Sequence, residues 1–539
     1  MSAAAVPSPP SPPHAPSPAH VLALVERGDA GRALALAHLL VQAEPGSADA
    51  WNAVGLAAAA CGQLSSALRF LDQAIALDGE SVEAHNNRGG VLCGLGRAAE
   101  GIDAFASALR RRPDDPAAWD NLLLASHLVP TVTPEAAADL HRAWGRRVEA
   151  STAITRIPPP PARTGRPLRI GYVSGDLRRH PVAAFIEPVL AHHDRDRYQV
   201  LAYATSAGGD EVTTRLRAKA DDFRAIAHLS DDEGARLIAA DRVDVLVDLS
   251  GHTRGNRLGL FARRPAPLQI AYLGYPGTTG LRRMDFRITD AWADPPGTTE
   301  PLHTEALLRV SGGFLCYGGA DLGADAAPLP AGDRPGRSGR GRPFTFGSFN
   351  HLSKLGPTVV RAWARILTGV PRARLLLKAH GLSDPEARAA VRAAFEKERV
   401  DPRRIDLEAH LAEVTDHLRR YDDVDLALDP FPYSGTTTTC EALSMGTPVL
   451  TLAGRAHVSR VSAALLAQVG LPDLVASSEE DYVRRAVIFA ERPGGPAEPR
   501  SSLRDRVARS PLMDAAAFVR RLEAAFDEAW AAIAPGRAA

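Results

Sequence analysis

The sequence predicts two kinds of structure in one chain, a stack of helix pairs followed by two α/β units that each contain a parallel sheet. Three observations support this fold class. Residues 20–130 repeat with a period of 34, which is typical of stacked helix pairs. From Leu168 onward, apolar β-branched runs alternate with helical patterns, as in parallel sheets covered by helices. A segment rich in Gly and Arg, residues 332–343, divides that alternation into two halves.

The composition excludes several classes of protein. Apolar residues make up 45% of the 539 residues and charged ones 23%, which is ordinary for a soluble globular protein. Lys plus Arg and Asp plus Glu both number 63, so the charge balance indicates no nucleic-acid partner. No apolar run is long enough to span a bilayer, and the N-terminal sequence lacks the features of a signal peptide. Four scattered cysteines fit a reducing compartment, so we expect a cytoplasmic protein without a membrane anchor.

The N-terminal part divides into a tail and a repeat array. Residues 1–18 are rich in Pro, Ser and Ala, and we expect them to be disordered. In residues 19–130, Gly28, Gly62 and Gly96 recur every 34 residues, and Trp51, His85 and Trp119 keep the same interval. This pattern resembles the tetratricopeptide repeat, whose helix pairs form a superhelix with a concave binding face. The alternative is an alanine-rich helical bundle without a regular superhelix.

A helical extension and a proline linker, residues 131–167, precede the first α/β unit, residues 168–335. We expect strands at 168–174, 199–204, 243–249 and 268–273, with helices at 182–192 and 231–240. Ligands of parallel sheets bind at the carboxyl ends of the strands. Three polar loops follow strands there, and any one alone could be simple turn chemistry. Their candidate side chains are His180 in the first loop, His252 and Thr253 in the second, and Tyr275, Gly277 and Thr278 in the third.

The second α/β unit, residues 336–539, contains the clearest binding motif. A buried strand ends at Asp429, and Gly435 with Thr436–Thr439 then leads into a helix. Such an elbow points backbone N–H groups and hydroxyls at one spot, where the helix dipole favours phosphate. By itself it could be a helix start with surplus capping residues. We expect Lys354, His417 and Arg420 at the same end of the sheet, which together predicts a diphosphate site; Lys354 alone could be a surface cation.

Other cofactor signatures are missing from the sequence. Neither unit shows GxGxxG after its first strand, and GxxxxGK[ST] occurs nowhere, which disfavours dinucleotide redox chemistry and P-loop hydrolysis. No clustered Cys and His set or H-E-x-x-H motif indicates a metal. Two such units, one holding a diphosphate and the other presenting polar loops, suit group transfer from a nucleotide-activated donor. We expect no cofactor beyond that substrate.

The motifs GYVSGD…HP, GHT, RPAPLQIAYLGYPGTTG, FGSFNHLSK and DPFPYSGTTTTCEALSMGTPV, with the repeats, resemble the O-linked N-acetylglucosamine transferase/SPINDLY family. The resemblance covers nearly everything from residue 20 onward, in the family's domain order. It implies a tetratricopeptide superhelix followed by a GT-B glycosyltransferase of two Rossmann-like lobes. It also implies transfer of a sugar from a nucleoside diphosphate to Ser/Thr hydroxyls of proteins, with inversion and without a metal.

The resemblance assigns roles residue by residue. His180 matches the family's active-site histidine and is a candidate base by type, and Lys354 matches the lysine that neutralises the donor diphosphate. The remaining donor-binding matches are His351 beside the nucleotide, His417 and Arg420 on its base and phosphate sides, Thr437 and Thr438 at the diphosphate, and Glu441 at the ribose. Gly435 and Thr436 complete the donor-binding elbow.

The resemblance leaves two candidates for the donor nucleotide sugar. The N-acetylglucosamine enzymes have His-Thr-Thr where this chain has Thr436, Thr437 and Thr438. The threonine run looks more like the SPINDLY branch, whose plant members use GDP-fucose. We take UDP-N-acetylglucosamine as the expected donor, GDP-fucose as the alternative, and an inactive repeat scaffold as a third reading. Protein or peptide acceptors are expected to bind through the repeats.

Overall fold

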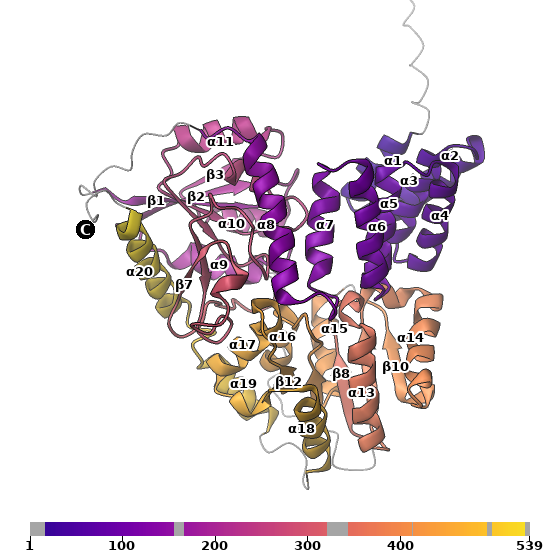
Figure 1. Ribbon diagram of the computed structural model, residues 1–539. Coiled ribbons are helices and arrows are strands. Elements are labelled where there is room, and N and C mark those ends of the chain that lie inside the picture. Colours follow the sequence, from indigo (N-terminus) through magenta and orange to yellow (C-terminus); the bar gives the residue numbers. More distant parts are fainter. Residues whose placement is uncertain (1–16, 156–165, 321–342, 412, 493–498, 534–539) are drawn as a thin grey trace, which may run out of the picture.

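The computed structural model describes residues 17–155, 166–320, 343–411, 413–492 and 499–533. Residues 1–16 of the predicted tail, most of the proline linker and nearly all of the segment at 332–343 lie outside these ranges, while residues 17 and 18 of that tail form the start of the first helix. The first described part is helical (Figure 1), with helices α1 (Pro18–Glu26), α2 (Ala30–Ala43), α3 (Ala48–Ala60), α4 (Leu64–Leu77), α5 (Val82–Gly94), α6 (Ala98–Arg111), α7 (Pro116–Ser126) and α8 (Pro134–Ser151).

Each repeat is built by the same local interactions. Gly28, Gly62 and Gly96 sit in the turns that follow α1, α3 and α5, with φ values of +81°, +75° and +77° that favour glycine. The indole N–H groups of Trp51 and Trp119 donate to the carbonyl six residues earlier, both at 2.9 Å, and His85 contacts the equivalent carbonyl at 3.1 Å. The predicted superhelix of helix pairs is confirmed.

The first lobe is a parallel sheet of seven strands in the order β3-β2-β1-β4-β5-β6-β7. Its strands are β1 (Leu168–Ser174), β2 (Tyr198–Ala204), β3 (Asp222–Ala225), β4 (Val245–Asp248), β5 (Leu268–Ala271), β6 (Phe286–Thr289) and β7 (Ala306–Arg309). Helices α9 (Ala183–His192), α10 (Glu211–Arg217), α11 (Asp231–Ala240) and α12 (Leu258–Phe261) lie in the connections. The four predicted strands are present within a few residues of their predicted ends.

The second lobe is a parallel sheet of six strands in the order β10-β9-β8-β11-β12-β13. Its strands are β8 (Thr345–Ser348), β9 (Arg374–Lys378), β10 (Ile405–Glu408), β11 (Leu426–Leu428), β12 (Val449–Leu452) and β13 (Val475–Ala476). Its helices are α13 (Pro357–Gly369), α14 (Pro385–Lys397), α15 (Val414–Arg419), α16 (Thr437–Ser444), α17 (Val461–Val469), α18 (Glu479–Glu491) and α19 (Arg500–Ala508). Two parallel sheets after a helical superhelix confirm the predicted fold class.

The last described helix, α20 (Ala515–Ile533), returns to the first lobe (Figure 1). Its buried Glu523 accepts hydrogen bonds from the ring Nδ1 of His193 and the backbone N–H of Asp194, both at 2.9 Å. Tyr172 of β1 lies on the other side of that ring, with its hydroxyl 2.8 Å from Nε2. The predicted boundary at residue 336 therefore assigns α20 to the second unit, although this helix packs against the first lobe.

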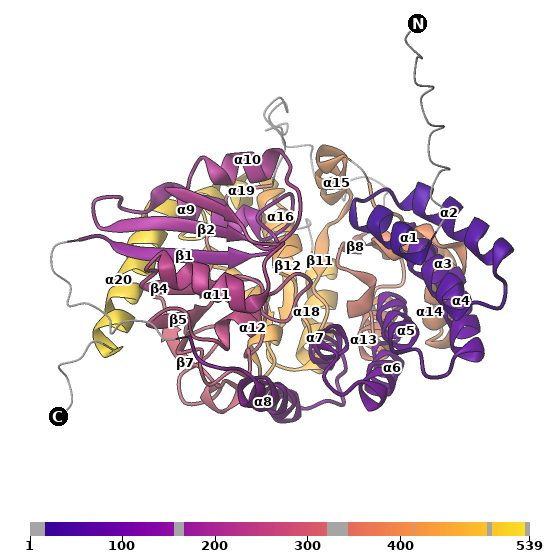
Figure 2. The same cartoon turned by 90° about the horizontal axis from the view of Figure 1, so that it is seen from above.

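The superhelix lies against both lobes instead of standing apart on a linker (Figure 2). Helix α8 packs on the first lobe, where Trp144 joins the hydrophobic cluster of that sheet. On the second lobe, the backbone N–H of Ser65 in α4 donates to Asp384 at 2.6 Å. A Cβ at Gly96 would lie 3.1 Å from the carbonyl oxygen of Leu355, so the turn after α5 touches the second lobe directly.

Candidate functional site

A cavity of about 810 Å³ lies between the two lobes at the carboxyl ends of their strands. His180 and the start of α9 form its wall on the first lobe, and His417, Thr437 and Glu441 form the wall on the second. Four predicted residues from three separate stretches of the sequence are thus brought together at one cleft. This is the place where ligands of parallel α/β sheets are expected.

His180 reaches this cavity from the loop after β1, with 39% of its side chain exposed. The backbone N–H of Val182 donates to its Nδ1 at 3.3 Å, and Asp176 lies 3.6 Å from the same nitrogen. Desolvation lowers the pKa of His180, and the charge of Asp176 opposes that shift. Since Nδ1 accepts a hydrogen bond, the neutral ring carries its hydrogen on Nε2 and offers a donor there.

The threonine elbow is held from beneath by Asp429, which is buried at the end of β11. One carboxylate oxygen accepts from the N–H of Gly435 at 2.6 Å, and the other accepts from the Thr451 hydroxyl at 2.7 Å. A Cβ at Gly435 would lie 2.6 Å from the Thr439 hydroxyl, so only glycine fits at this bend. Helix α16 then begins at Thr437, which lines the cavity, so the positive end of the helix faces the cleft.

Lys354 meets the elbow from the loop after β8. Its ammonium donates to the Ser434 carbonyl at 2.8 Å and to the Asn350 side-chain oxygen at 3.2 Å, and it lies 4.4 Å from the centre of the Tyr433 ring. Thr438 donates to the same Asn350 oxygen at 3.2 Å. Burial lowers the pKa of Lys354 to about 8, while Asp429 opposes that shift. The structure therefore joins the predicted lysine to the predicted elbow.

Of the other predicted donor-binding residues, two pair with each other and two are held by separate contacts. His417 and Glu441 form one pair, in which ring Nε2 lies 3.0 Å from a carboxylate oxygen. The guanidinium of Arg420 is paired with Glu408 at 2.9 Å and with Asp423, so its donors are not offered to the cavity. His351 caps the short turn that contains Lys354, where its Nδ1 accepts from the N–H of Ser353 at 3.3 Å.

The two remaining polar loops of the first lobe bind the helical domain instead of lining the interlobe cavity. The ring of His252 contacts Asp120 of α7 at 2.8 Å and the Thr279 carbonyl at 2.9 Å. The Tyr275 hydroxyl lies 2.7 Å from Nε2 of His141 in α8. Thr278 donates to buried Glu305 at 2.6 Å, Thr253 donates to the Ser250 carbonyl at 2.9 Å, and a Cβ at Gly277 would lie 2.7 Å from His127.

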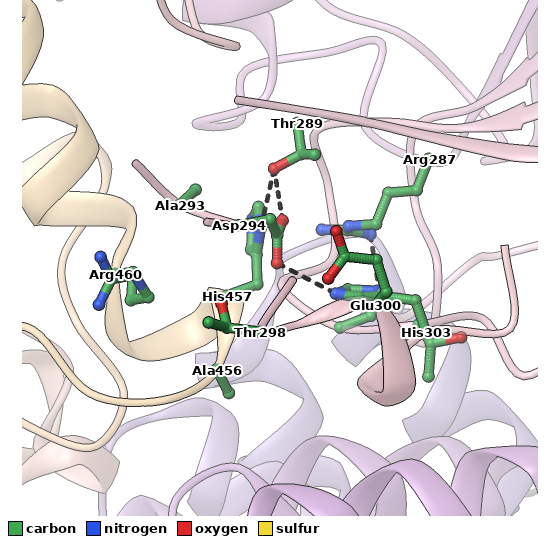
Figure 3. A network of polar contacts seen from close by, with 12 residues as sticks. Arg287, Thr289, Ala293, Asp294, Thr298, Glu300, His303, Ala456, His457 and Arg460 are labelled. Carbon is green, nitrogen blue, oxygen red and sulfur yellow. Dashed lines mark hydrogen bonds and ion pairs between the residues drawn. The ribbon is translucent and has the colours of Figure 1, made fainter. Parts of the chain in front are cut away.

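A buried polar network joins the lobes beside the elbow (Figure 3). The carboxylate of Asp294 in the first lobe lies 2.6 Å from the ring of His457 in the second lobe and 3.1 Å from the ring of His303 in its own lobe. It also accepts a hydrogen bond from the Thr289 hydroxyl. Burial lowers the pKa of His457 to about 4, so the ring is neutral near pH 7 and donates from Nδ1. The carbonyl of the next residue, Val458, accepts from Ser434 in the elbow, which ties this network to the site.

Sequence reasoning did not identify Asp429, Asn350, Asp294 and His457 as contributors to the site. Asp429 and Asn350 each follow an apolar strand directly, which is a signal that could have marked them. Asp294 and His457 are 163 residues apart in sequence, and only the docking of the two lobes makes them neighbours.

A second hollow of about 1180 Å³ lies between the concave face of the superhelix and the first lobe. His252 and Thr253 line it together with asparagine side chains from three successive first helices. These amides are linked between helices, from Asn87 to Asn52 and from Asn121 to Asn86, each at 2.9 Å. The hollow is open, its lining combines these polar side chains with apolar ones such as Leu22 and Leu56, and its size suits an extended peptide segment.

No group of three His, Cys, Asp or Glu side chains among the described residues is placed to hold a metal ion. No helix in the same part of the chain combines the length and apolar character needed to cross a membrane.

Comparison with known proteins identifies similar sequences and structures. Residues 155–315 and 342–522 match the sequence model of Glycosyl transferase family 41. A tomato protein (Solanum lycopersicum) named "Probable UDP-N-acetylglucosamine--peptide N-acetylglucosaminyltransferase SPINDLY" is 39% identical over 432 residues, which cover 78% of this chain and 45% of that protein. The protein named SEC from Arabidopsis thaliana, with the same enzyme description, is 32% identical and covers 67% of this chain and 37% of its own length.

A solved structure matches along almost the whole chain. It is that of a mutant O-GlcNAc transferase of Thermobaculum terrenum, with a TM-score of 0.88 and 38% identity, and the match covers 96% of this chain and 97% of that one. By contrast, this chain spans about half the length of the curated relatives it matches.

Proposed function

We propose, because this chain belongs to glycosyltransferase family 41, that it transfers a sugar from a nucleoside diphosphate sugar to Ser/Thr hydroxyls of proteins. The observation that carries the proposal is the contact of Lys354 with Ser434 and, through Asn350, with the threonine elbow, whose Thr437 lines the interlobe cavity. A buried ammonium and a helix N-terminus at one point form a site suited to a diphosphate.

The reaction would proceed by attack of the acceptor oxygen on the anomeric carbon while the bond from that carbon to the diphosphate oxygen breaks. Negative charge then grows on the leaving diphosphate. Lys354 and the first N–H groups of α16 are fixed in place before the reaction, so they stabilise this charge without reorganising. Because protein groups supply that positive charge, we propose that transfer requires no metal ion.

The acceptor hydroxyl must lose a proton during the attack. His180 lies at the cleft, but its Nδ1 accepts from the N–H of Val182, so the neutral ring presents an N–H at Nε2. A ring in that state donates a hydrogen bond and takes no proton. We therefore assign His180 to orienting the donor sugar or the acceptor, with the proton passing to solvent or to the departing diphosphate.

The proposed donor is UDP-N-acetylglucosamine, the sugar nucleotide in the printed names of the curated relatives. GDP-fucose is the second candidate, since the run Thr436–Thr439 resembles the SPINDLY branch. A site that hydrogen-bonds one base leaves buried polar groups unpaired when offered the other. Discrimination between the two donors should therefore be strong.

Calorimetric titration of UDP and GDP, side by side, into the protein tests the donor. We expect UDP to bind at least about tenfold more tightly than GDP. A preference for GDP would replace the donor and leave the reaction class in place. Failure of both nucleotides to bind would favour the inactive scaffold and contradict the proposed function.

The acceptor is proposed to bind in the hollow between the superhelix and the first lobe. Asn52, Asn87 and Asn121 present amide groups there, and such groups pair with the backbone of an extended peptide without requiring a particular sequence. A peptide bound there would contact the same lobe that carries His180.

A further inference from the structure

We infer that Lys378 is a positioning residue of the donor site, which acts on the nucleotide through His417 and Glu441. The inference rests on the proposed function, because it assigns a task within nucleotide binding. Neither the sequence motifs nor the resemblance singled out Lys378. Three contacts carry the argument, and each concerns the second lobe alone.

Lys378 is the last residue of β9, at the carboxyl edge of the sheet where the predicted donor contacts lie. It is 3% exposed, and its ammonium contacts Nδ1 of His417 and lies 4.8 Å from the centre of the Phe349 ring. Burial lowers the pKa of Lys378 to about 8, with Glu441 and Glu408 opposing that shift. A lysine this deeply buried is expected to have a specific partner.

The carboxylate next to Lys378 is already occupied. Glu408 lies opposite Lys378 in the register of β9 and β10, but Arg420 binds both of its carboxylate oxygens. The charged and titratable groups around the ammonium are Glu408 with Arg420 on one side, His417 with Glu441 on the other, and His410 nearby. The hydrogen-bond acceptor within reach of the ammonium is the imidazole.

The ammonium fixes the tautomer of that imidazole. A lysine ammonium can only donate, so Nδ1 of His417 must be the unprotonated nitrogen. The ring hydrogen therefore resides on Nε2, which donates to Glu441 at 3.0 Å. The Tyr421 hydroxyl, which donates to the Thr438 carbonyl at 3.1 Å, lies 3.5 Å from the same carboxylate oxygen. Lys378 thus donates to His417 and His417 donates to Glu441, so both hydrogen bonds run in the same direction.

This chain ends on the wall of the interlobe cavity, where His417 and Glu441 are both exposed to a ligand. Without Lys378 the ring could turn over or exchange its tautomer, and Glu441 would lose a fixed donor. A nucleoside would then have to order both side chains as it bound, which weakens binding. Lys378 itself does not line that cavity, so its effect on a ligand is transmitted by its neighbours.

The test compares Lys378→Met, which removes the charge at similar size, with Lys378→Arg and with Lys397→Met on the exposed last turn of α14. Calorimetry with UDP and GDP should show that Lys378→Met weakens binding of the preferred nucleotide about tenfold. Lys378→Arg should recover part of that loss, and Lys397→Met should match the wild type. In transfer assays, the donor KM of Lys378→Met should rise while kcat stays within about twofold.

A spectroscopic measurement on the free protein separates this inference from the proposed function. Spectra of ¹⁵N-labelled histidine, with the His417→Gln variant to assign the signal, should show His417 protonated on Nε2 in the wild type and in Lys378→Arg. In Lys378→Met the signal should move toward a mixture of tautomers. An unchanged His417 signal, or unchanged nucleotide affinity in a folded Lys378→Met protein, would overturn the inference. If wild-type protein binds neither nucleotide, the proposed function fails and the spectra still decide the role of Lys378.

Discussion

Lys354 is the residue on which the proposed chemistry depends most. Replacement with Met keeps the length of the side chain and removes a buried charge, which proteins tolerate when the group is not needed for folding. We expect kcat to fall by about 10²–10³, the usual cost of losing one preorganised charge-stabilising donor, with a smaller change in the donor KM. Steady-state kinetics with a thermal unfolding scan check this. Wild-type turnover would show that the ammonium does not act on the leaving group.

His457 offers a test of the interlobe network through pH. Its pKa is about 4 in the folded protein against an ordinary value of 6.5. The unfolded chain therefore binds a proton more readily, so the stability that neutral His457 contributes is present above pH 6.5 and is lost as the pH falls toward 4. At that limit the loss is up to about 3 kcal/mol.

The measurement is the free energy of unfolding of wild type and His457→Gln, determined by denaturant titration from pH 8 to 4. Burial also lowers the pKa values of other histidines such as His127 and His141, so the difference between the two profiles is the informative quantity. We expect the wild-type advantage to shrink as the pH falls from 6.5 to 4. Parallel profiles across that range would show that His457 does not titrate as described.

At the scale of elements, α7 serves a different purpose from the one its sequence suggested. The repeat pattern makes it the start of another helix pair, and its Trp119 bond follows the period. Helix α7 also contacts the first lobe, where its Asp120 binds His252 at 2.8 Å and Asn256 at 2.6 Å. Deleting residues 1–130, the predicted tail and repeat array, would remove this partner from the buried ring of His252 and the half-buried amide of Asn256.

Asp120→Ala should therefore destabilise the whole protein. Removing one partner of a buried hydrogen bond costs about 1–3 kcal/mol, so the thermal midpoint should fall by several degrees. The matched control is Asp49→Ala, an exposed aspartate of α3 that lines the same hollow. Equal midpoints for the two variants, in calorimetric scans, would mean that the contact with His252 contributes nothing to docking.

The sequence predicted long and strongly patterned elements well and short ones poorly. Strand β1 and helix α11 begin and end at their predicted residues, because each has a regular apolar pattern between polar or turn residues. Strands β3 and β10, DFRA and IDLE, are four-residue edge strands without an apolar run, so pairing with a neighbour is what makes them strands. Helix α16 begins at Thr437, three residues before its predicted start, because the threonines belong to its first turn.

At the candidate site, residues placed by one lobe could be predicted from the sequence, and contacts with distant segments could not. The elbow and Lys354 were predictable because each follows a predicted strand within one lobe, and His417 was identified through the family resemblance. The polar loops with His252 and Tyr275 have the same local pattern, but their partners are Asp120 and His141 of the helical domain. A sequence pattern shows that a polar loop follows a strand, and it does not show which distant segment satisfies its side chains.

At the scale of the whole molecule, the superhelix touches both lobes and leaves its concave face open toward the first (Figure 2). Replacing Asn52 and Asn121 together with Ala should raise the KM for a protein acceptor about tenfold, because two backbone-pairing amides are lost. Nucleotide affinity, measured by calorimetry, should stay within about twofold. An unchanged acceptor KM would place the acceptor elsewhere.

The central claim is that the interlobe cleft transfers a sugar from a nucleoside diphosphate to protein hydroxyls, with Lys354 bearing the charge of the leaving group. The most direct measurement is mass spectrometry of a protein acceptor after incubation with UDP-N-acetylglucosamine or GDP-fucose in the presence of EDTA. We predict that wild type adds to Ser or Thr the mass of one N-acetylhexosamine from UDP-N-acetylglucosamine or of one deoxyhexose from GDP-fucose, and that Lys354→Met makes the addition at least about a hundredfold slower. Absence of any increment with either donor, or equal rates for the two proteins, would contradict the account.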